Sequence, residues 1–310
     1  MTFTNTLKLC FIIPTKDRPF EIERLFKSII IQDVLPSQII VVDGGKPGIK
    51  NIVEKFPQLK IDYMQVLPPG LTRQRNAGLN AVRNDIDIVG FLDDDIVFET
   101  QCIKNMSDFW KQAPADTGGA GFNIIDNKYP NKPAWFFKLF LIRDNNPGRI
   151  LKSGRNVPYC PAKDTHSVQW LCGGATVWRK EIFKKFKFDE WFSAWGIGDD
   201  LDFSYRVGKE YSFMVVADAK VRHIETGIPS KRQYLRAYIA TMNNMYFAEK
   251  HYEFSKILSA WSFLGQGFAF LIQGVAKRGN SDLNRGLGHC TAALRGLFFG
   301  VQQVDRQVKN

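Results

Sequence analysis

Residues 7–31 read LKLCFIIPTKDRPFEIERLFKSIII and set the pattern for the N-terminal part of the chain. The compact apolar run Leu7–Ile13 predicts a buried strand. Pro19 then opens an amphipathic stretch, Phe20–Ile31, whose apolar side chains recur at helical spacing. A buried strand followed directly by a helix is one unit of an α/β protein, in which helices cover a sheet.

The same alternation continues through the first 125 residues. Further strands are predicted at Ile39–Val42, Ile61–Val66 and Ile86–Leu92, with helices at Ile49–Phe56, Leu71–Val82 and about Thr100–Trp110. Strands alternating with helices over short turns indicate a Rossmann-like, mostly parallel sheet with flanking helices. Ligands of such folds bind beyond the carboxyl ends of the strands, so functional side chains are expected there.

Beyond residue 125 the pattern is less regular. Residues 126–165 hold five prolines and no clear period, which predicts a long loop. There follow a predicted strand at Val168–Val177, helices at Arg179–Lys185 and Asp199–Glu210, and two short strands at Phe213–Val216 and Lys220–Ile224. From residue 230 onward the segments are helical, basic and aromatic. We therefore expect an α/β domain over residues 1–229 and a helical appendage over residues 230–310.

Composition and charge limit the classes of protein to which the chain can belong. The chain has 310 residues, 45% of them hydrophobic and 24% charged, so it can bury a full core. Its 42 basic and 31 acidic residues give a net charge of +11, which suggests an anionic partner. Eleven basic and only four acidic residues lie in 230–310. Five cysteines without a C-x-x-C pair indicate a reduced cytosolic chain rather than a disulfide scaffold or a zinc site.

Three consecutive acids, Asp93, Asp94 and Asp95, follow the predicted strand at Ile86–Leu92. Neighbouring anions repel one another unless a cation is present. Alternate residues of an extended segment share a face, so Asp93 and Asp95 are expected to point the same way. We interpret them as ligands of Mg²⁺ or Mn²⁺ rather than as a solvated turn or a helix cap. His223, at another strand end, is a candidate third ligand, although a lone histidine is more often structural.

Two further clusters also follow predicted strands. Asp43 precedes Gly44-Gly45, and its carboxylate either accepts hydrogen bonds from a nucleoside or shapes an ordinary turn. Arg73 and Arg75 stand at the start of a predicted helix, where arginine can meet a phosphate or a nucleobase. A solvated helix face is the alternative, and it suits one of the two arginines better than both.

Residues 191–202 read WFSAWGIGDDLD and form a second acidic cluster. Trp191 and Trp195 either stack on sugar rings or simply pack. Asp199 and Asp200 stand at a predicted helix start, where aspartate commonly caps the helix. One of them can cap the helix while the other acts as a general base, which needs a free carboxylate.

Together these segments resemble an inverting nucleotide-sugar glycosyltransferase of the GT-A fold, family 2. The matching segments, in the family's order, are FIIPTKDR (11–18), IVVDGG (40–45), GLTRQRNAGL (70–79), DDD (93–95), LCGGA (171–175) with Arg179, and GDDLD (198–202). Two positions depart from the family motifs. Gly44 replaces a second acid, and Asp199 replaces the usual Glu of the G-E-D-x-D motif.

The resemblance implies a site and a reaction. The nucleotide would be held by Thr15, Asp17, Arg18, Asp43, Arg75 and Asp93, the Mn²⁺ or Mg²⁺ by Asp93, Asp95 and His223, and the donor or acceptor sugar by Gly173, Gly174, Trp191 and Trp195. Asp200 would be the general base, with Asp199 as the alternative. Residues 1–125 would bind the nucleotide sugar and 126–229 the acceptor. The enzyme would move a sugar, with inversion, from a nucleoside diphosphate to a hydroxyl of a glycan or lipid-linked saccharide.

Two other functions fit less well. A sugar-phosphate nucleotidyltransferase would need a glycine-rich phosphate loop with a downstream lysine, where this chain has Pro14-Thr15-Lys16-Asp17. A non-enzymatic protein that binds nucleic acid or membrane would explain the net charge. Nucleic-acid binding predicts basic residues interleaved with exposed aromatics, whereas the basic excess here lies beside an uncharged run, so no nucleic-acid partner is expected.

That uncharged run lies in the basic tail. A predicted S-x-x-Q capping box, Ser230 with Gln233, opens a helix to about Tyr252. Residues 257–276 then carry no charge and are bounded by basic residues, and a second helix, about 281–299, contains two arginines. The run is either an amphipathic anchor on anionic lipid, a membrane span, or part of a helical subdomain that packs on the catalytic domain. Lipid-linked acceptors, implied by the resemblance, favour a cytoplasmic enzyme at the membrane surface.

Overall fold

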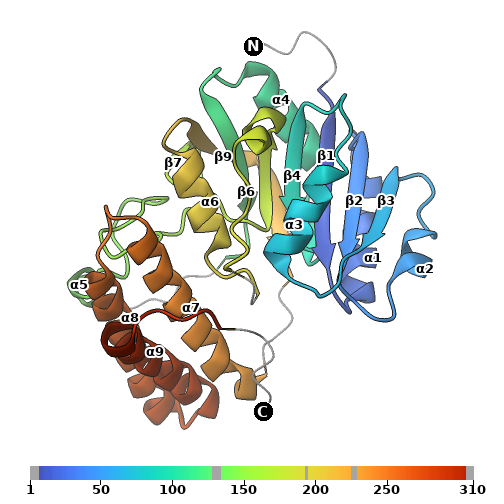
Figure 1. Ribbon diagram of the computed structural model, residues 1–310. Coiled ribbons are helices and arrows are strands. Elements are labelled where there is room, and N and C mark those ends of the chain that lie inside the picture. The colour runs from blue at the N-terminus through green and yellow to red at the C-terminus, as the bar shows by residue number, and fades with distance from the viewer. Residues whose placement is uncertain (1–6, 128–133, 193–194, 225–228, 305–310) are drawn as a thin grey trace. The chain divides into compact units, whose positions relative to one another are not determined.

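The computed structural model describes residues 7–127, 134–192, 195–224 and 229–304 (Figure 1). The chain forms two compact units, the first comprising residues 1–128, 159–190 and 199–225, and the second 129–158, 191–198 and 226–310. The second unit thus takes in two segments, 129–158 and 191–198, that the sequence placed in the α/β domain. Aromatic contacts tie both segments to the C-terminal helices. Phe140 stacks on Trp261, and Trp191 stacks on Tyr246.

The first unit is built on one sheet with strand order β3-β2-β1-β4-β8-β6-β9-β5, and β7 pairs with β9. Its parallel half consists of β1 (Leu9–Thr15), β2 (Gln38–Asp43), β3 (Ile61–Gln65) and β4 (Ile88–Leu92). The other half is mixed and consists of β5 (Ile96–Phe98), β6 (Thr117–Ile124), β7 (His166–Val168), β8 (Ala175–Arg179) and β9 (Ser212–His223). The predicted parallel arrangement is therefore confirmed for the N-terminal half, whereas β8 runs antiparallel to β4 and β6.

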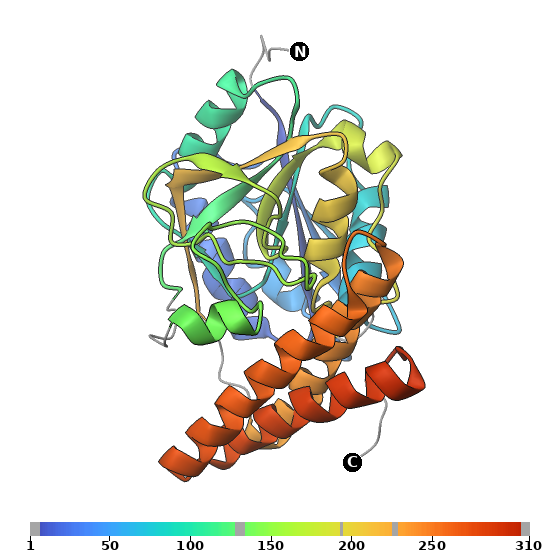
Figure 2. The same ribbon diagram turned by 90° about the vertical axis from the view of Figure 1, so that its left-hand side faces the viewer.

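Helices cover both faces of this sheet. They are α1 (Pro19–Ile30), α2 (Lys50–Val53), α3 (Leu71–Asn80), α4 (Cys102–Gln112) and α6 (Asp199–Val207), with a 3₁₀ turn η1 at Lys180–Lys184. Figures 1 and 2 show α3 and α6 on one face and α1 and α4 on the other. Because β1 pairs in parallel with β2 and β4, the carboxyl ends of these three strands meet at one edge.

The structure corrects several predictions in the mixed half. The strand expected at Val168–Val177 is two strands, β7 and β8, separated by a turn that contains Gly173 and Gly174. The two strands expected at 213–216 and 220–224 are one strand, β9, with a register shift against β6. Strand β6 itself was not predicted because its glycines lack a strand signature. They make room for a neighbour, since a Cβ on Gly119 would lie 2.6 Å from the Trp178 ring.

The second unit is helical. It contains α5 (Ala134–Leu139), inside the segment expected to be a loop, and the long helices α7 (Ser230–Lys250), α8 (Lys256–Lys277) and α9 (Asn280–Phe299). Figure 2 shows α8 and α9, in orange and red, packed against each other. The capping-box prediction is wrong, because Pro229 rather than Ser230 occupies the N-cap of α7 and no side chain caps it.

A buried histidine links α7 to α9. His289 on α9 is 6% exposed, and its Nδ1 lies 2.9 Å from the hydroxyl of Thr241 on α7. That hydroxyl donates to the carbonyl of Ala237, so it accepts from Nδ1–H of a neutral imidazole. Burial, with the nearby charges of Arg155 and Arg285, lowers the pKa of His289 to about 3.

This histidine predicts acid sensitivity. Between the ordinary pKa of about 6.5 and the lowered value, the unfolded chain binds a proton that the folded chain does not. The free energy of unfolding therefore decreases as the pH is lowered through this range. We expect the wild type to lose about 2 kcal/mol of unfolding free energy relative to His289→Gln between pH 6.5 and 5. Urea denaturation of both proteins across this range measures the difference. Parallel curves for the two proteins would contradict the prediction.

Candidate active site at the carboxyl edge of the sheet

The acidic turn after β4 is partly neutralised by residues that follow β1. Thr15 Oγ1 donates to Asp94 Oδ2 at 2.7 Å, and Arg18 donates to Asp94 Oδ1 at 2.6 Å and to Asp95 Oδ2 at 2.9 Å. Burial raises the pKa of Asp94 to about 7, against the opposing effects of Arg18 and Thr15. Thr15 and Arg18, predicted to bind the nucleotide, are thus placed by the structure against the middle and last acids of the turn.

Three ligand-type side chains converge beside this turn. One ligand atom each from Asp93, Asp95 and His223 lies within 4.8 Å of the others. His223 Nε2 is 3.0 Å from Asp95 Oδ1, which is buried and has no hydrogen-bond donor besides this contact among the described residues. Burial alone would raise the pKa of Asp95, but His223 and Arg18 outweigh it and lower that pKa. Two carboxylates and an imidazole suit a divalent cation such as Mn²⁺ or Mg²⁺.

A buried arginine joins this turn to α6. Arg75 on α3 is 1% exposed, and its guanidinium donates to Asp199 Oδ2 at 2.6 Å, Asp93 Oδ1 at 3.4 Å and the Gly173 carbonyl at 3.0 Å. Burial would lower the pKa of Arg75, but the surrounding carboxylates raise it. Arg73, two residues earlier on α3, lies at the surface and pairs with Glu190 at 3.5 Å. The structure thus places Arg75, which the resemblance names, among the acids at the sheet edge and Arg73 at the surface, and the contact of Arg75 with the nucleotide stays a prediction.

The two acids at the start of α6 have different environments. Asp199 is 3% exposed and is taken up by Arg75, whereas Asp200 is only partly buried. Asp200 Oδ2 accepts from the backbone N–H of Gly173 at 3.1 Å, and Oδ1 accepts from that of Leu201 at 2.8 Å. Burial raises the pKa of both carboxyls, and Arg75 opposes that rise. Among the described residues no basic side chain forms an ion pair with Asp200, and two backbone donors fix its position.

The glycines between β7 and β8 allow these groups to meet. A Cβ on Gly173 would lie 2.9 Å from both Arg75 Nη1 and Asp200 Cβ, and one on Gly174 would lie 2.1 Å from Asp93 Oδ2. The backbone of this turn also pairs with the acidic turn, because the Gly174 carbonyl accepts from the Asp93 N–H at 2.8 Å. The predicted sugar-binding glycines thus lie directly between Asp93 and Asp200.

Asp43, at the end of β2, is buried and forms its own loop. Its carboxylate accepts from the N–H groups of Gly45 and Ile49 at 2.7 and 2.8 Å, and from the Tyr63 hydroxyl at 2.8 Å. Gly44, where the family motif has a second acid, is pressed against Pro69, since a Cβ there would lie 2.6 Å from Pro69 Cβ. Asp43 therefore serves the turn, and its contact with a nucleoside stays a prediction.

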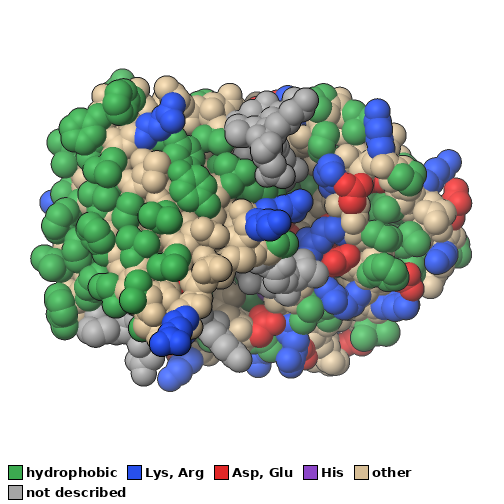
Figure 3. Space-filling model, turned by 90° about the horizontal axis from the view of Figure 1, so that it is seen from below, with side chains coloured by type: hydrophobic (Ala, Val, Ile, Leu, Met, Phe, Trp, Pro, Cys, Tyr) green, Lys and Arg blue, Asp and Glu red, His purple; other side chains and the backbone are tan. Residues whose placement is uncertain are grey.

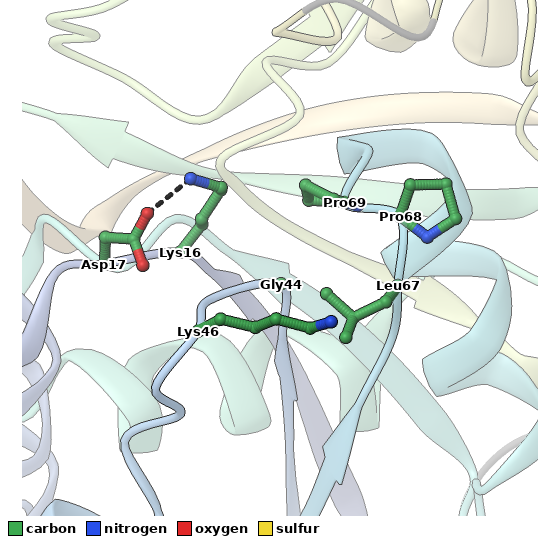
Figure 4. Close-up of a pocket in the computed structure, with 7 residues that line it drawn as sticks. All are labelled: Lys16, Asp17, Gly44, Lys46, Leu67, Pro68 and Pro69. Carbon is green, nitrogen blue, oxygen red and sulfur yellow. Dashed lines mark hydrogen bonds and ion pairs between the residues drawn. The ribbon is translucent and has the colours of Figure 1, made fainter.

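A pocket of about 570 Å³ lies beside this loop (Figure 4). It is lined by Lys16, Asp17, Gly44, Lys46, Leu67, Pro68 and Pro69. These residues come from the turns after β1 and β2 and from the segment before α3, and Lys16 pairs with Asp17. Proline and leucine walls with lysine ammonium groups at the edge suit a flat base and an anionic group attached to it. Asp17 is the predicted nucleotide ligand that lines the pocket.

Two predicted residues belong to the second unit, and one important residue was missed. Trp191 stacks on Tyr246, with ring centroids 3.7 Å apart, so packing occupies one of its faces. Trp195 is also in this unit and has a left-handed backbone, with φ 53°.

The missed residue is Gln74 on α3, whose amide donates to the carbonyls of Thr15 and Val42 and so ties two strand ends together. A single glutamine in a helix carries no sequence signal for this role.

Comparison with known proteins defines the family. The model of the family described as glycosyl transferase family 2 matches residues 10–186. The chain belongs to glycosyl transferase family 2. The matched region contains β1 to β4, the acidic turn and the Gly173-Gly174 turn, and the family membership confirms that the protein is a glycosyltransferase.

Individual relatives of this family member are distant. Minor teichoic acid biosynthesis protein GgaA of Bacillus subtilis (strain 168) is 25% identical over 185 residues, which are 59% of this chain and 38% of that protein. The chain thus spans about two fifths of the length of this relative. Mannosyltransferase PcManGT from Pyrobaculum calidifontis, in complex with GDP-Man and Mn²⁺, superposes with a TM-score of 0.59 at 16% identity, covering 96% of this chain and 88% of that one.

TarS 1–349 from S. aureus, in complex with UDP, gives a TM-score of 0.52 at 16% identity, covering 91% of this chain and 90% of that one. At these identities the likeness concerns the fold, and it confirms the predicted GT-A architecture with its C-terminal helices.

Proposed function

We propose that this family 2 glycosyltransferase transfers a sugar, with inversion, from a nucleoside diphosphate to an acceptor hydroxyl, using a divalent cation at Asp93, Asp95 and His223 and Asp200 as the general base. The observation that carries the proposal is the position of the Gly173-Gly174 turn. It separates the cluster of Asp93, Asp95 and His223 from the Asp200 carboxylate, which forms no ion pair with a basic side chain of the described residues. A diphosphate on one side and an attacking hydroxyl on the other would meet above these glycines.

The chain's own groups define the remaining steps. The Asp200 carboxylate, held by two backbone N–H groups, takes the proton of the acceptor hydroxyl as that oxygen attacks the anomeric carbon. Arg75 holds Asp199 and Asp93 in place, so it is a positioning residue. A cation at the cluster would stabilise the negative charge of the diphosphate leaving group. The pocket lined by Asp17 and Lys46 would hold the nucleobase.

The acceptor is proposed from charge and kinship. The relative GgaA is named as a minor teichoic acid biosynthesis protein, and this chain carries a net charge of +11. Both support an anionic glycan or lipid-linked saccharide as the acceptor and a cytoplasmic site of action at the membrane surface. Trp191 and Trp195 remain candidates for contact with that acceptor.

Loss of a cation ligand tests the proposal. We expect Asp95→Ala to abolish the Mn²⁺-dependent thermal stabilisation by UDP-, GDP- or dTDP-sugars and to lower their hydrolysis at least about 100-fold, because it removes a carboxylate ligand. A screen of these donors with and without Mn²⁺ measures both effects. Asp108→Asn, on the exposed surface of α4, is the matched control and should behave as the wild type. Normal metal-dependent turnover by Asp95→Ala would overturn the assignment.

The glycine turn gives a second test of the same cluster. In Gly174→Ala the new methyl group would occupy the position of the Asp93 carboxylate, so Asp93 must move away. We expect the Mn²⁺ concentration for half-maximal turnover to rise about tenfold or more. Gly279→Ala, where nothing lies within 4 Å of the added Cβ, is the control. An unchanged Mn²⁺ dependence in Gly174→Ala would show that Asp93 is not a ligand.

A further inference from the structure

The helical unit exposes large apolar side chains along one stripe of α8. Ile257, Trp261, Phe268, Ile272 and Val275 are 43–71% exposed. Their spacings of four, seven, four and three residues place them on a single helix face. Figure 3 shows hydrophobic side chains spread broadly over the left part of the view, where the helical unit lies. A contiguous exposed apolar area of this kind marks an interaction surface.

The inward faces of α8 and α9 carry mostly small residues, whereas those of a water-soluble helix bundle carry large apolar ones. On α8 they carry Ser259, Ala260, Ser262, Gly265, Gly267 and Gly274, with Phe263 as the large exception. On α9 they carry Gly286, Gly288, Ala292, Ala293 and Gly296, with His289. Small residues that bring helix backbones together while large apolar residues face outward are typical of helices in contact with lipid.

The close approach of the two helices is visible at their glycines. A Cβ on Gly267 would lie 3.0 Å from the Gly286 carbonyl, and one on Gly286 would lie 2.8 Å from the Gly267 carbonyl. The polar groups of α8 also point inward, where Ser259 donates to Asn244 and Ser262 to the Leu141 carbonyl. The outer stripe is therefore apolar without leaving these hydroxyls unpaired.

Helix α9 extends the apolar surface. Leu287, Leu294 and Phe298 are 46–76% exposed and are spaced by seven and four residues, which again places them on one face. The segment around α5 adds to it beside α8, because Trp261 Nε1 donates to the Leu139 carbonyl at 3.0 Å and Leu139 is 55% exposed. We call the exposed apolar residues of α5, α8 and α9 the outer apolar face.

Basic residues flank this face. Lys138 on α5 is exposed, Lys277 and Arg278 end α8, and Arg295 is exposed beside Leu294 on α9. Cationic groups at the border of an apolar surface complement anionic headgroups while the apolar side chains enter the acyl region. A water-soluble protein partner would not require small residues on the inner faces, so this combination selects lipid as the occupant.

We propose that the outer apolar face inserts into one leaflet of an anionic membrane, with α8 lying in the plane of the interface. Helix α8 is long and apolar enough to cross a membrane. If α8 alone of the described helices spanned a membrane, lipid would surround every side of it, whereas α8 is covered on its inner side by α7, α9 and residues 139–141. The proposal does not depend on the reaction catalysed at the sheet edge.

Vesicle flotation of the full chain tests the proposal. We expect the wild type to float with vesicles that contain 30% phosphatidylglycerol and to float at least tenfold less with pure phosphatidylcholine. Phe268→Glu/Ile272→Glu should reduce binding to the anionic vesicles at least tenfold, since two carboxylates then face the acyl region. The control is Ile31→Glu, a substitution of an equally exposed apolar residue at the end of α1 in the first unit.

A second measurement uses the wild-type fold. Brominated acyl chains should quench tryptophan fluorescence of the bound protein, and Trp135→Phe/Trp261→Phe should remove most of this quenching, because these two indoles lie on the outer apolar face. Binding by the double-glutamate variant equal to the wild type would overturn the proposal. The proposal would also be overturned if the wild type bound no vesicles and instead formed a dimer that the same substitutions dissociate. The partner of the outer apolar face would then be a second copy of the chain. Nucleotide-sugar hydrolysis, assayed without lipid, should be unchanged in the double-glutamate variant.

Discussion

Asp200→Asn is expected to lower kcat for sugar transfer by about 10²–10⁴-fold, because the amide cannot accept the proton of the attacking hydroxyl. The amide oxygen can still accept the Gly173 N–H, so donor binding should be close to normal. Steady-state kinetics with the best donor from the screen, together with the donor Kd from calorimetry, separates the two effects.

The neighbouring acid provides the matched comparison. Asp199→Asn removes the negative charge that balances Arg75, so its main effect should be on stability rather than on proton transfer. If Asp199→Asn lost turnover at unchanged stability while Asp200→Asn kept it, the roles of the two acids would be reversed. This comparison resolves the question that the G-D-D-x-D sequence raises, because the two carboxylates differ in environment rather than in chemistry.

Arg75→Met is expected to lower the free energy of unfolding by about 3–5 kcal/mol. The substitution removes the cation on which Asp93 and Asp199 depend and leaves buried carboxylates without a counter-charge. Denaturant unfolding of the full chain measures the loss. Arg73→Met, on the exposed side of the same helix, is the matched control and should change stability by no more than about 0.5 kcal/mol.

A double variant keeps this prediction falsifiable. Adding Asp199→Asn to Arg75→Met removes one of the stranded charges, so the double variant should be more stable than Arg75→Met alone. An additive loss would mean that the two side chains do not interact, contrary to the 2.6 Å contact between them.

The sequence was informative where a residue type strongly favours one kind of structure or site. Apolar runs predicted β1 to β4, and the acids that follow them led to the edge at which the site forms. It failed where the structure depends on close approach. Gly119 in β6 is there because the Trp178 ring occupies the space that a Cβ would take, and no local pattern records that neighbour. Arg75 and Arg73 are equally basic in the sequence, and only tertiary packing separates them.

The same limit applies to the tail. The uncharged run of α8 was recognised, but its meaning depends on which of its faces is covered. Ser259 and Ser262 interrupt the run in sequence, whereas in the structure they bond inward and leave the outer stripe apolar. The composition of the run cannot distinguish inward-facing from outward-facing serines, because it does not record the direction in which each side chain points.

The pairing of Arg18 and Arg75 with the acids bears on the proposed cation site. Arg18 already pairs with Asp94 and Asp95, and Arg75 with Asp93 and Asp199, so the polypeptide itself balances part of the negative charge at this edge. A metal ion that binds there is not needed to hold the strand ends together. We propose that such an ion would bind together with the diphosphate and leave with it, as part of the substrate complex rather than of the fold.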